Sequence, residues 1–185
     1  MKSKPILITV AFCFLIFAST FYYTNQKEQI ELRTSYSSFT KDMRKELLCL
    51  ADNIYFEAVG ESTRGQIAVA YVTLNRVLAD NYPDRICDVV HQKTGGVCQF
   101  SWFCMQHHVK QRQRVRKSEE YQDILALAIN VFLNYNRKDD VTKGSTFYHA
   151  DYVNPQWRLR KVVKIGRHIF YRHQPDYYSM KGKTL

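Results

Sequence analysis

The feature that most constrains the fold is a helical repeat of apolar residues in the first half of the chain. Between residues 42 and 58 apolar side chains recur at steps of three and four, the pattern of a helix with one buried face. Gly60 ends this pattern, and Ser62 or Thr63 can cap a second helix of the same spacing that runs to about residue 79. Two consecutive amphipathic helices need a shared core, so we expect a helical domain.

The remaining pattern predicts one more long helix, followed by short strands. We expect a short helical turn at 86–91, irregular structure at 93–105, and a helix that begins at Ser118 with Glu119 and Glu120 in its first turn. Beyond Asn136 the runs become β-like, with the last two forming a hairpin around Gly166 and Arg167. The predicted strands are 145–151, 161–165 and 168–172. The predicted fold class is α+β, mainly α.

The N-terminus has the pattern of an export or anchoring segment. Residues 5–23 carry no charge and follow Lys2 and Lys4. Ala18, Ser19 and Thr20 resemble a signal-cleavage site, whereas Phe21 to Tyr23 prolong the apolar run, which favours an uncleaved membrane anchor over a cleaved signal. We therefore divide the chain into a signal or anchor at 1–23, a polar tether at 24–40, the domain at 41–174 and a basic tail at 175–185. The domain is expected to face the outside of the membrane, in the periplasm or cell wall.

Four cysteines lie outside the apolar N-terminal run, an even number that suits disulfides in an exported protein. Three pairings are open. The spacing favours a local Cys87–Cys98 loop, with Cys49 then joined to Cys104. No C-x-x-C pair is present, so a zinc site is disfavoured and we expect no metal.

Charge suggests an anionic polymer as partner. The formal net charge is +10, and a dense basic run occupies 107–117. Such a run is usually a solvated face, but outside the cell it could hold wall polymers or phospholipid head groups. It carries no aromatic residue for stacking on bases, so a nucleic-acid partner is not expected.

The stretch from Asn53 to Gln66 contains the residue most suited to catalysis. Glu57 is flanked by Tyr55, Phe56 and Ala58, and an apolar setting raises the pKa of a carboxyl group toward the range in which it donates a proton near neutral pH. Cleavage of a glycosidic bond needs such a donor. Glu61, four residues later, fits an exposed residue or a helix cap better.

This stretch and several later motifs resemble the SleB/CwlJ-like cell-wall hydrolase family. The hallmark is Asn-Ile-Tyr-Phe-Glu-Ala-x-Gly-Glu at 53–61, followed by the motifs at 65–70 and 74–77. The resemblance continues from Leu48 to Tyr171. Further matching motifs lie at 82–83, 86–90, 98–102, 147–150, 155–157 and 165–171. Val59 and Ser62 depart from the hallmark, which often has Arg and Pro there.

The resemblance implies a lysozyme-like, transglycosylase-related fold that acts on peptidoglycan glycan strands, with Glu57 as the catalytic acid. It implies no cofactor, and we expect a monomer. Flat aromatic rings and hydrogen-bonding groups suit a saccharide cleft, so the predicted substrate-binding residues come from the two polar and aromatic motifs and the second acid. These residues are Gln99, Ser101, Trp102, Tyr148, His149 and Glu61.

Two chemistries and a rival class remain open from the sequence. If Glu57 alone acts, the product is a 1,6-anhydro sugar, and the absence of an obvious second acid in the motif favours this lytic transglycosylase route. If water attacks, a second carboxylate such as Asp151 or Glu61 is needed. A module that binds wall without cutting it is the rival, and a zymogram separates the two classes.

Overall fold

The computed structural model describes residues 4–173, apart from the side chains of 4–9, 25, 28–33, 35, 106, 108 and 109. Contacts divide the chain into two units, Met1–Phe39 and Thr40–Leu185. The predicted basic tail at 175–185 lies outside the described residues.

The described part of the first unit is a single helix, α1 (Lys4–Ser38), which spans the ranges predicted as signal or anchor and as tether. Residues 24–38 are helical where irregular structure was expected, because they contain neither Gly nor Pro and several good helix formers continue the helix. A search of the described residues finds no helix long and apolar enough to cross a bilayer, so the expected membrane anchor at 5–23 is not supported. Hydroxyl groups lower the hydropathy of this stretch, and those of Ser19 and Thr20 bond back to helix carbonyls.

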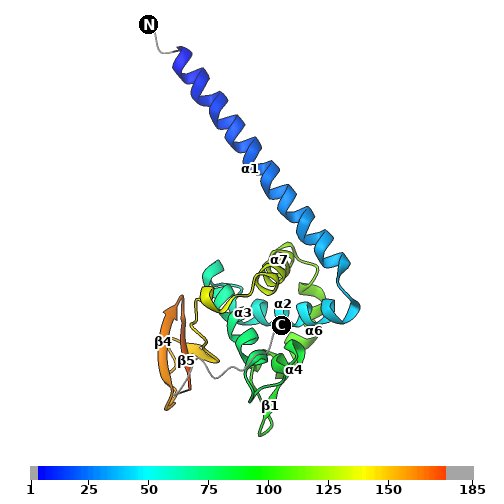
Figure 1. The fold of residues 1–185 in the computed structure, drawn as a ribbon, viewed down its shortest axis with the longest axis vertical. Helices are drawn as coiled ribbons and strands as arrows, with labels where there is room; N and C mark the ends of the chain where they lie inside the picture. The colour runs from blue at the N-terminus through cyan, green and yellow to red at the C-terminus, as the bar shows by residue number, and fades with distance from the viewer. Residues whose placement is uncertain (1–3, 174–185) are drawn as a thin grey trace. The chain divides into compact units, whose positions relative to one another are not determined.

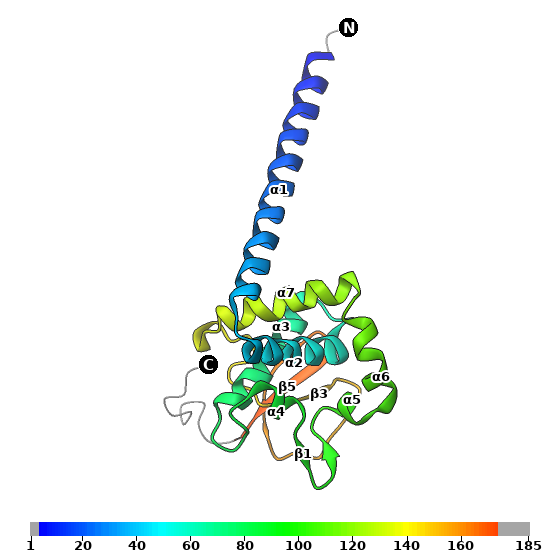
Figure 2. The same cartoon turned by 90° about the vertical axis from the view of Figure 1, so that its right-hand side faces the viewer.

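The second unit is built around α2 (Lys41–Ala58) and α3 (Thr63–Leu78), which confirms the two helices predicted from periodicity. Thr40 caps α2 and Ser62 caps α3, each hydroxyl accepting a backbone N–H three residues ahead. The long helix α7 (Glu119–Leu133) packs along α2, and Ser118 caps it as expected. Figure 2 shows α7 lying across α2, with α3 behind them.

Short elements connect these helices. The predicted turn at 86–91 is α4 (Ile86–Val90), and the irregular segment contains the small hairpin β1 (Lys93–Thr94) and β2 (Val97–Cys98), followed by α5 (Ser101–Cys104). The basic run forms a helix, α6 (Gln106–Val115), which the sequence analysis did not assign. A single 3-10 turn, Arg137–Asp139, follows α7.

A three-stranded antiparallel sheet in the order β3-β5-β4 completes the unit. Its strands are β3 (Phe147–Ala150), β4 (Arg160–Ile165) and β5 (His168–Arg172), which confirms the predicted strands and hairpin. Figure 1 shows β4 and β5 at one edge of the domain, on the side of α3.

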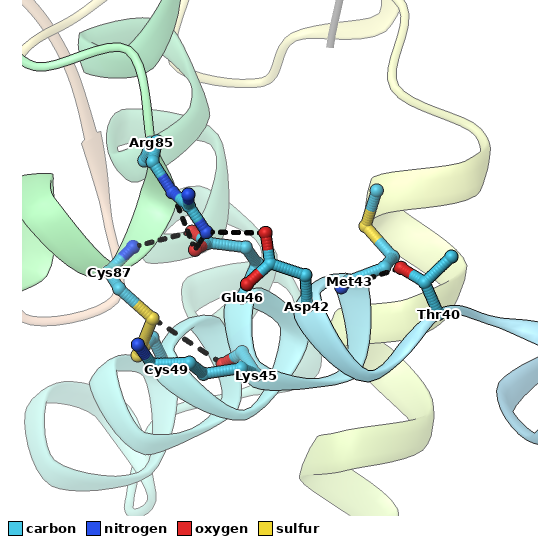
Figure 3. A network of polar contacts seen from close by, with 8 residues as sticks. All are labelled: Thr40, Asp42, Met43, Lys45, Glu46, Cys49, Arg85 and Cys87. Carbon is cyan, nitrogen blue, oxygen red and sulfur yellow. Dashed lines mark hydrogen bonds and ion pairs between the residues drawn. A yellow bond between two sulfur atoms is a disulfide. The ribbon is translucent and has the colours of Figure 1, made fainter.

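Two disulfides are present, but the expected pairing was wrong. Cys49 pairs with Cys87, and Cys98 pairs with Cys104. The first bond joins α2 to α4, whose packing brings the two Cα atoms to 5.2 Å. Figure 3 shows this bond beside Glu46, which accepts hydrogen bonds from Arg85 and from the backbone N–H of Cys87. The second bond closes the short loop between β2 and the end of α5.

Candidate active site

Glu57 lies in the last turn of α2 and keeps part of its surface accessible. Burial raises the pKa of its carboxyl group above the ordinary glutamate value. Its place at the carbonyl end of the helix also disfavours a negative charge, because the helix dipole is negative there. Glu57 is therefore a carboxyl group that holds its proton to higher pH than an exposed glutamate does.

Tyr148 is the hydrogen-bond partner of Glu57. The Tyr148 hydroxyl donates to Glu57 Oε2 at 2.9 Å, and this contact lowers the pKa of Glu57, against the larger effect of burial. Burial and the neighbouring carboxyl raise the pKa of Tyr148 well above its usual value, so the hydroxyl keeps its proton and remains a donor. Tyr148 comes from β3, so this single bond links the end of α2 to the sheet.

Arg76, on α3, supplies a buried positive charge to the same region. Only 4% of the residue is exposed, and its Nε donates to the carbonyl of Thr146 at 2.8 Å. Its guanidinium lies 4.9 Å from the centre of the Phe100 ring, and its charge lowers the pKa of Glu57. An arginine stays protonated even when buried, so it is a permanent cation near the carboxyl group.

The segment that leads into β3 is held by a buried polar network around Asn75. The Asn75 amide donates to Asp140 Oδ2 at 2.9 Å and to the carbonyl of Ser145 at 3.1 Å, while its own oxygen accepts from Tyr135 at 2.8 Å. Asn75 and Arg76, adjacent on α3, thus bind the carbonyls of Ser145 and Thr146. These two carbonyls lie in the segment that leads to Tyr148. The sequence analysis quoted Asn75 and Arg76 within a motif but gave them no role. A cation and an amide on the buried side of a helix were the available signal.

Trp102 does not form the expected wall of a saccharide cleft. It is 2% exposed, its indole Nε1 donates to Asn53 Oδ1 at 2.9 Å, and Phe56 stacks on it with ring centres 4.7 Å apart. Both faces of the ring are therefore unavailable to a sugar. Trp102 therefore packs against α2 through Asn53 and Phe56, and Phe56 is the residue before Glu57.

Gln99 and Ser101 remain exposed, as a substrate-binding role requires. The Gln99 amide donates to Thr94 Oγ1 at 3.1 Å, which holds it over the β1–β2 hairpin. Ser101 is the first residue of α5. Both are sequence neighbours of the buried residues Phe100 and Trp102, and their role in substrate binding stays a prediction.

His149 and Glu61 occupy positions other than those expected. Successive residues of a strand point to opposite faces, so Tyr148 points to Glu57 while His149 points away and bonds to Tyr171 at 2.9 Å. The Glu61 carboxylate accepts the backbone N–H of Arg167 at 3.2 Å. Gly166 has a φ of +55°, and a Cβ there would lie 1.9 Å from Glu61 Oε2, so this close contact requires glycine. Glu61 anchors the hairpin turn.

His168 is a further residue near Tyr148 that the sequence analysis did not single out. Its ring centre lies 5.1 Å from that of Tyr148, and it is 8% exposed. Burial lowers the pKa of His168, so its imidazole is neutral at neutral pH. It belongs to the packing around Tyr148 and adds no charge there.

Comparisons with a family profile and with a curated protein both relate this chain to enzymes of the cell wall or spore cortex. A profile of the Cell Wall Hydrolase family matches residues 60–171, a range that starts three residues after Glu57. A spore cortex-lytic enzyme of Halalkalibacterium halodurans is 27% identical over 128 residues, which cover 65% of this chain and 33% of that enzyme. The chain thus spans about a third of the length of that relative.

Two solved structures share the fold. The catalytic domain of the germination-specific lytic transglycosylase SleB from Bacillus anthracis has a TM-score of 0.51 at 23% identity, covering 73% of this chain and 98% of that one. The catalytic domain of the Bacillus cereus SleB protein has a TM-score of 0.50 at 23% identity, covering 73% and 93%. The family profile covers more than half of the chain, and on that ground this chain belongs to the SleB-like cell wall hydrolase family.

Proposed function

We propose that this domain cuts the glycan strands of peptidoglycan, with Glu57 as the acid that protonates the glycosidic oxygen. The observation that carries the proposal is the partly buried Glu57 carboxyl group, with its raised pKa and a single hydrogen bond from Tyr148. Membership of a cell wall hydrolase family supports the substrate class. The two disulfides support an oxidising, extracytoplasmic location, where such bonds persist.

The first step moves one proton. Glu57 donates to the bridging oxygen between N-acetylmuramic acid and N-acetylglucosamine while the bond from that oxygen to C1 breaks. The leaving sugar departs with a hydroxyl group, and C1 takes on oxocarbenium character. Glu57 is then a carboxylate, which the Tyr148 hydrogen bond and the Arg76 charge stabilise.

We further propose the lytic transglycosylase route for the second step. The Glu57 carboxylate removes the proton of the C6 hydroxyl, whose oxygen bonds to C1 and closes a 1,6-anhydro ring, so the acid is regenerated and no water is consumed. The two acids considered as partners for a water are engaged elsewhere, Asp151 with Lys164 at 2.9 Å and Glu61 with the turn at Arg167. The name of the Bacillus anthracis relative supports the same route.

Glu57→Gln tests the assignment. The variant keeps the size and hydrogen bonding of the side chain but cannot donate a proton, so release of muropeptides from purified peptidoglycan should fall by about 10²- to 10⁴-fold, the usual contribution of a general acid. Glu61→Gln is the matched control, since it carries the same change four residues away and should keep most of the activity. Retained activity in Glu57→Gln would end the assignment.

Mass spectrometry of the released fragments tests the route. Anhydro-muramic products lack one water relative to hydrolysis products, so muropeptides 18 Da lighter support transglycosylation, about the mass of the missing water. Reducing muramic ends would instead show that water attacks. A protein that clears no peptidoglycan in a zymogram yet pellets with it would be a binding module.

A further inference from the structure

The outer face of the three-stranded sheet differs from the face that meets Glu57. The inner face carries Tyr148 and Phe170, whose rings lie 5.6 Å apart and pack toward the core. Residues opposite one another on paired strands share a face, and Phe147 is opposite Tyr171 while His149 is opposite Ile169. The outer face therefore gathers Phe147, His149 and Tyr171.

Trp157 lies against these three rings and remains 42% exposed. Its ring centre is 5.8 Å from Phe147, 5.4 Å from His149 and 5.8 Å from Tyr171, each approached nearly edge to face. These contacts cover only part of the indole. We call Phe147, His149, Trp157 and Tyr171 the aromatic platform.

Hydrogen bonds hold two rings of the platform, His149 and Tyr171, in place. His149 Nδ1 lies 2.8 Å from the carbonyl of Ala150, so this nitrogen carries the proton, and Nε2 accepts from the Tyr171 hydroxyl at 2.9 Å. The two rings are also stacked, with centres 5.1 Å apart. A ligand that binds here does not have to order these side chains, which lowers the entropic cost of binding.

Positive charge surrounds the platform. The register places Lys161 opposite Tyr171 and Lys164 opposite Ile169, so both lysines join the outer face. Residues 152–173 contain six Lys and Arg residues and no Asp or Glu. Asp151, which precedes this range, is bound by Lys164 at 2.9 Å and lies 3.9 Å from Arg167. Arg158, which follows Trp157 in the sequence, and Lys161, which is opposite Tyr171, are both exposed.

We propose that the aromatic platform is a second carbohydrate-binding site, which holds an anionic glycan strand of the cell wall apart from Glu57. A sugar ring stacks on the exposed indole of Trp157, and carboxylates of the muramyl residues or stem peptides pair with Arg158 and Lys161. The inference rests on the proposed function for its substrate class. Because the platform and Tyr148 lie on opposite faces of one sheet, the site anchors the polymer and does not extend the catalytic cleft.

The geometry favours a glycan over a nucleic acid. Single-stranded nucleic acids stack successive bases on several exposed rings along a basic groove. Here the rings pack on one another edge to face, and of the four platform residues Trp157 alone is exposed, while the other three are half-buried. One exposed ring with cations at its border suits a single sugar of a charged polymer.

Pelleting of the full chain with purified peptidoglycan sacculi tests the proposal, using Glu57→Gln protein so that the wall is not digested. In that background Trp157→Ala, and separately Arg158→Glu with Lys161→Glu, should weaken binding about tenfold, the usual loss when a central contact is removed. The matched control is Lys110→Glu with Arg114→Glu, which makes the same charge change on exposed residues of α6. It should weaken binding by less than about threefold, because α6 offers positive charge with no Trp, Tyr or Phe ring on which a sugar can stack, and exposed charges are screened by salt.

The outcomes separate this site from its alternatives. Trp157→Ala could disturb packing, but the double charge variant alters only exposed side chains, so unchanged pelleting of that variant overturns the proposal. An equal loss in the α6 control, a larger loss on a single-stranded oligonucleotide than on sacculi, or a dimer that Trp157→Ala dissociates also overturns it.

A second assay keeps the platform distinct from the catalytic proposal. With Glu57 intact, the platform variants should cut a short soluble glycan fragment at the rate of the unmodified protein, within about twofold, because such a fragment needs no polymer anchor. A large loss on the fragment would place these residues in the cleft and overturn the anchoring role. If the unmodified protein does not cut the fragment, the proposed function fails, and the pelleting difference still measures the platform.

Discussion

Two ends of the same helix use buried acids in opposite ways. Near the start of α2, Glu46 accepts hydrogen bonds from Arg85 at 2.7 and 3.1 Å and from the Cys87 backbone at 2.8 Å, as Figure 3 shows. At its end, Glu57 accepts one bond from a neutral tyrosine. The Glu46 carboxylate is therefore bound by a cation and a backbone N–H, whereas Glu57 is a carboxyl group whose pKa burial raises. The type and number of partners, more than burial itself, separate a structural acid from a candidate catalyst.

Asp52, in the middle of α2, extends the structural class. Its side chain is 1% exposed, and it accepts from Arg116 at 2.5 and 2.9 Å and from the Tyr121 hydroxyl at 2.7 Å. These contacts tie α2 to the start of α7. The four acids of α2 thus form a series. Asp42, Glu46 and Asp52 each pair with an arginine, whereas no arginine lies within hydrogen-bond distance of Glu57 among the bonds of the described residues.

Asp52→Asn should give the largest effect on stability. The substitution leaves the partly buried Arg116 without its anion, and breaking such a pair costs about 3 kcal/mol of unfolding free energy. Urea denaturation measures this loss. Asp123→Asn, an exposed position on α7, should cost less than about 0.5 kcal/mol. Activity per folded molecule should stay unchanged in both. A specific loss of turnover in folded Asp52→Asn would break the division between structural and catalytic acids.

Tyr148→Phe should change the pH dependence of activity. The Tyr148 hydrogen bond lowers the pKa of Glu57, so its removal raises that pKa further. Because the protonated form is the proposed acid, the pH at which activity falls should move upward. We also expect a loss of about tenfold at the optimum, because the carboxyl group is no longer oriented.

Tyr121→Phe is the matched control for Tyr148→Phe. It removes a hydroxyl bound to Asp52 and should not change the pH at which activity falls. If the pH at which activity falls moves downward in Tyr148→Phe, or moves equally in both variants, then Tyr148 does not act on the pKa of Glu57.

The parts of this molecule that follow local rules could be predicted from the sequence. The helices α2, α3 and α7 have apolar periodicity and capping residues within their own segments, and β4 and β5 meet at Gly166. Glu57 was found from its neighbours and a family resemblance. Strand alternation could also have separated Tyr148 from His149, because adjacent residues cannot both face one partner.

Contacts between distant segments could not be predicted in this way. The Cys49–Cys87 bond depends on how α4 packs on α2, and spacing favoured a different pairing. Trp102 was expected in the cleft, but Asn53, 49 residues earlier, accepts its indole N–H and fixes it in the core. Arg76 acquires its position from Phe100 and Thr146, which lie in loops far from it in the sequence. In each case a partner remote in sequence decides the role.

The smallest expected effect is a pH-dependent gain in stability in Glu57→Gln. The folded-state pKa of Glu57 lies above its ordinary value. At pH below that ordinary value the carboxyl group is protonated in both the folded and the unfolded state, so its burial as a charge costs no unfolding free energy there. As pH rises through the folded-state pKa, the wild type must bury a carboxylate and loses stability. Gln carries no charge, so the variant keeps that stability.

Thermal unfolding at constant ionic strength over a pH series measures this difference. The melting temperatures of wild type and Glu57→Gln should nearly coincide in acid, and the variant should become the more stable protein at neutral and alkaline pH. Glu46→Gln is the matched control and should show the opposite sign at neutral pH, because it loses charged hydrogen bonds from Arg85. If Glu57→Gln is instead less stable than wild type at neutral pH, its carboxylate is a satisfied anion like that of Glu46, and the contrast between the two ends of α2 fails.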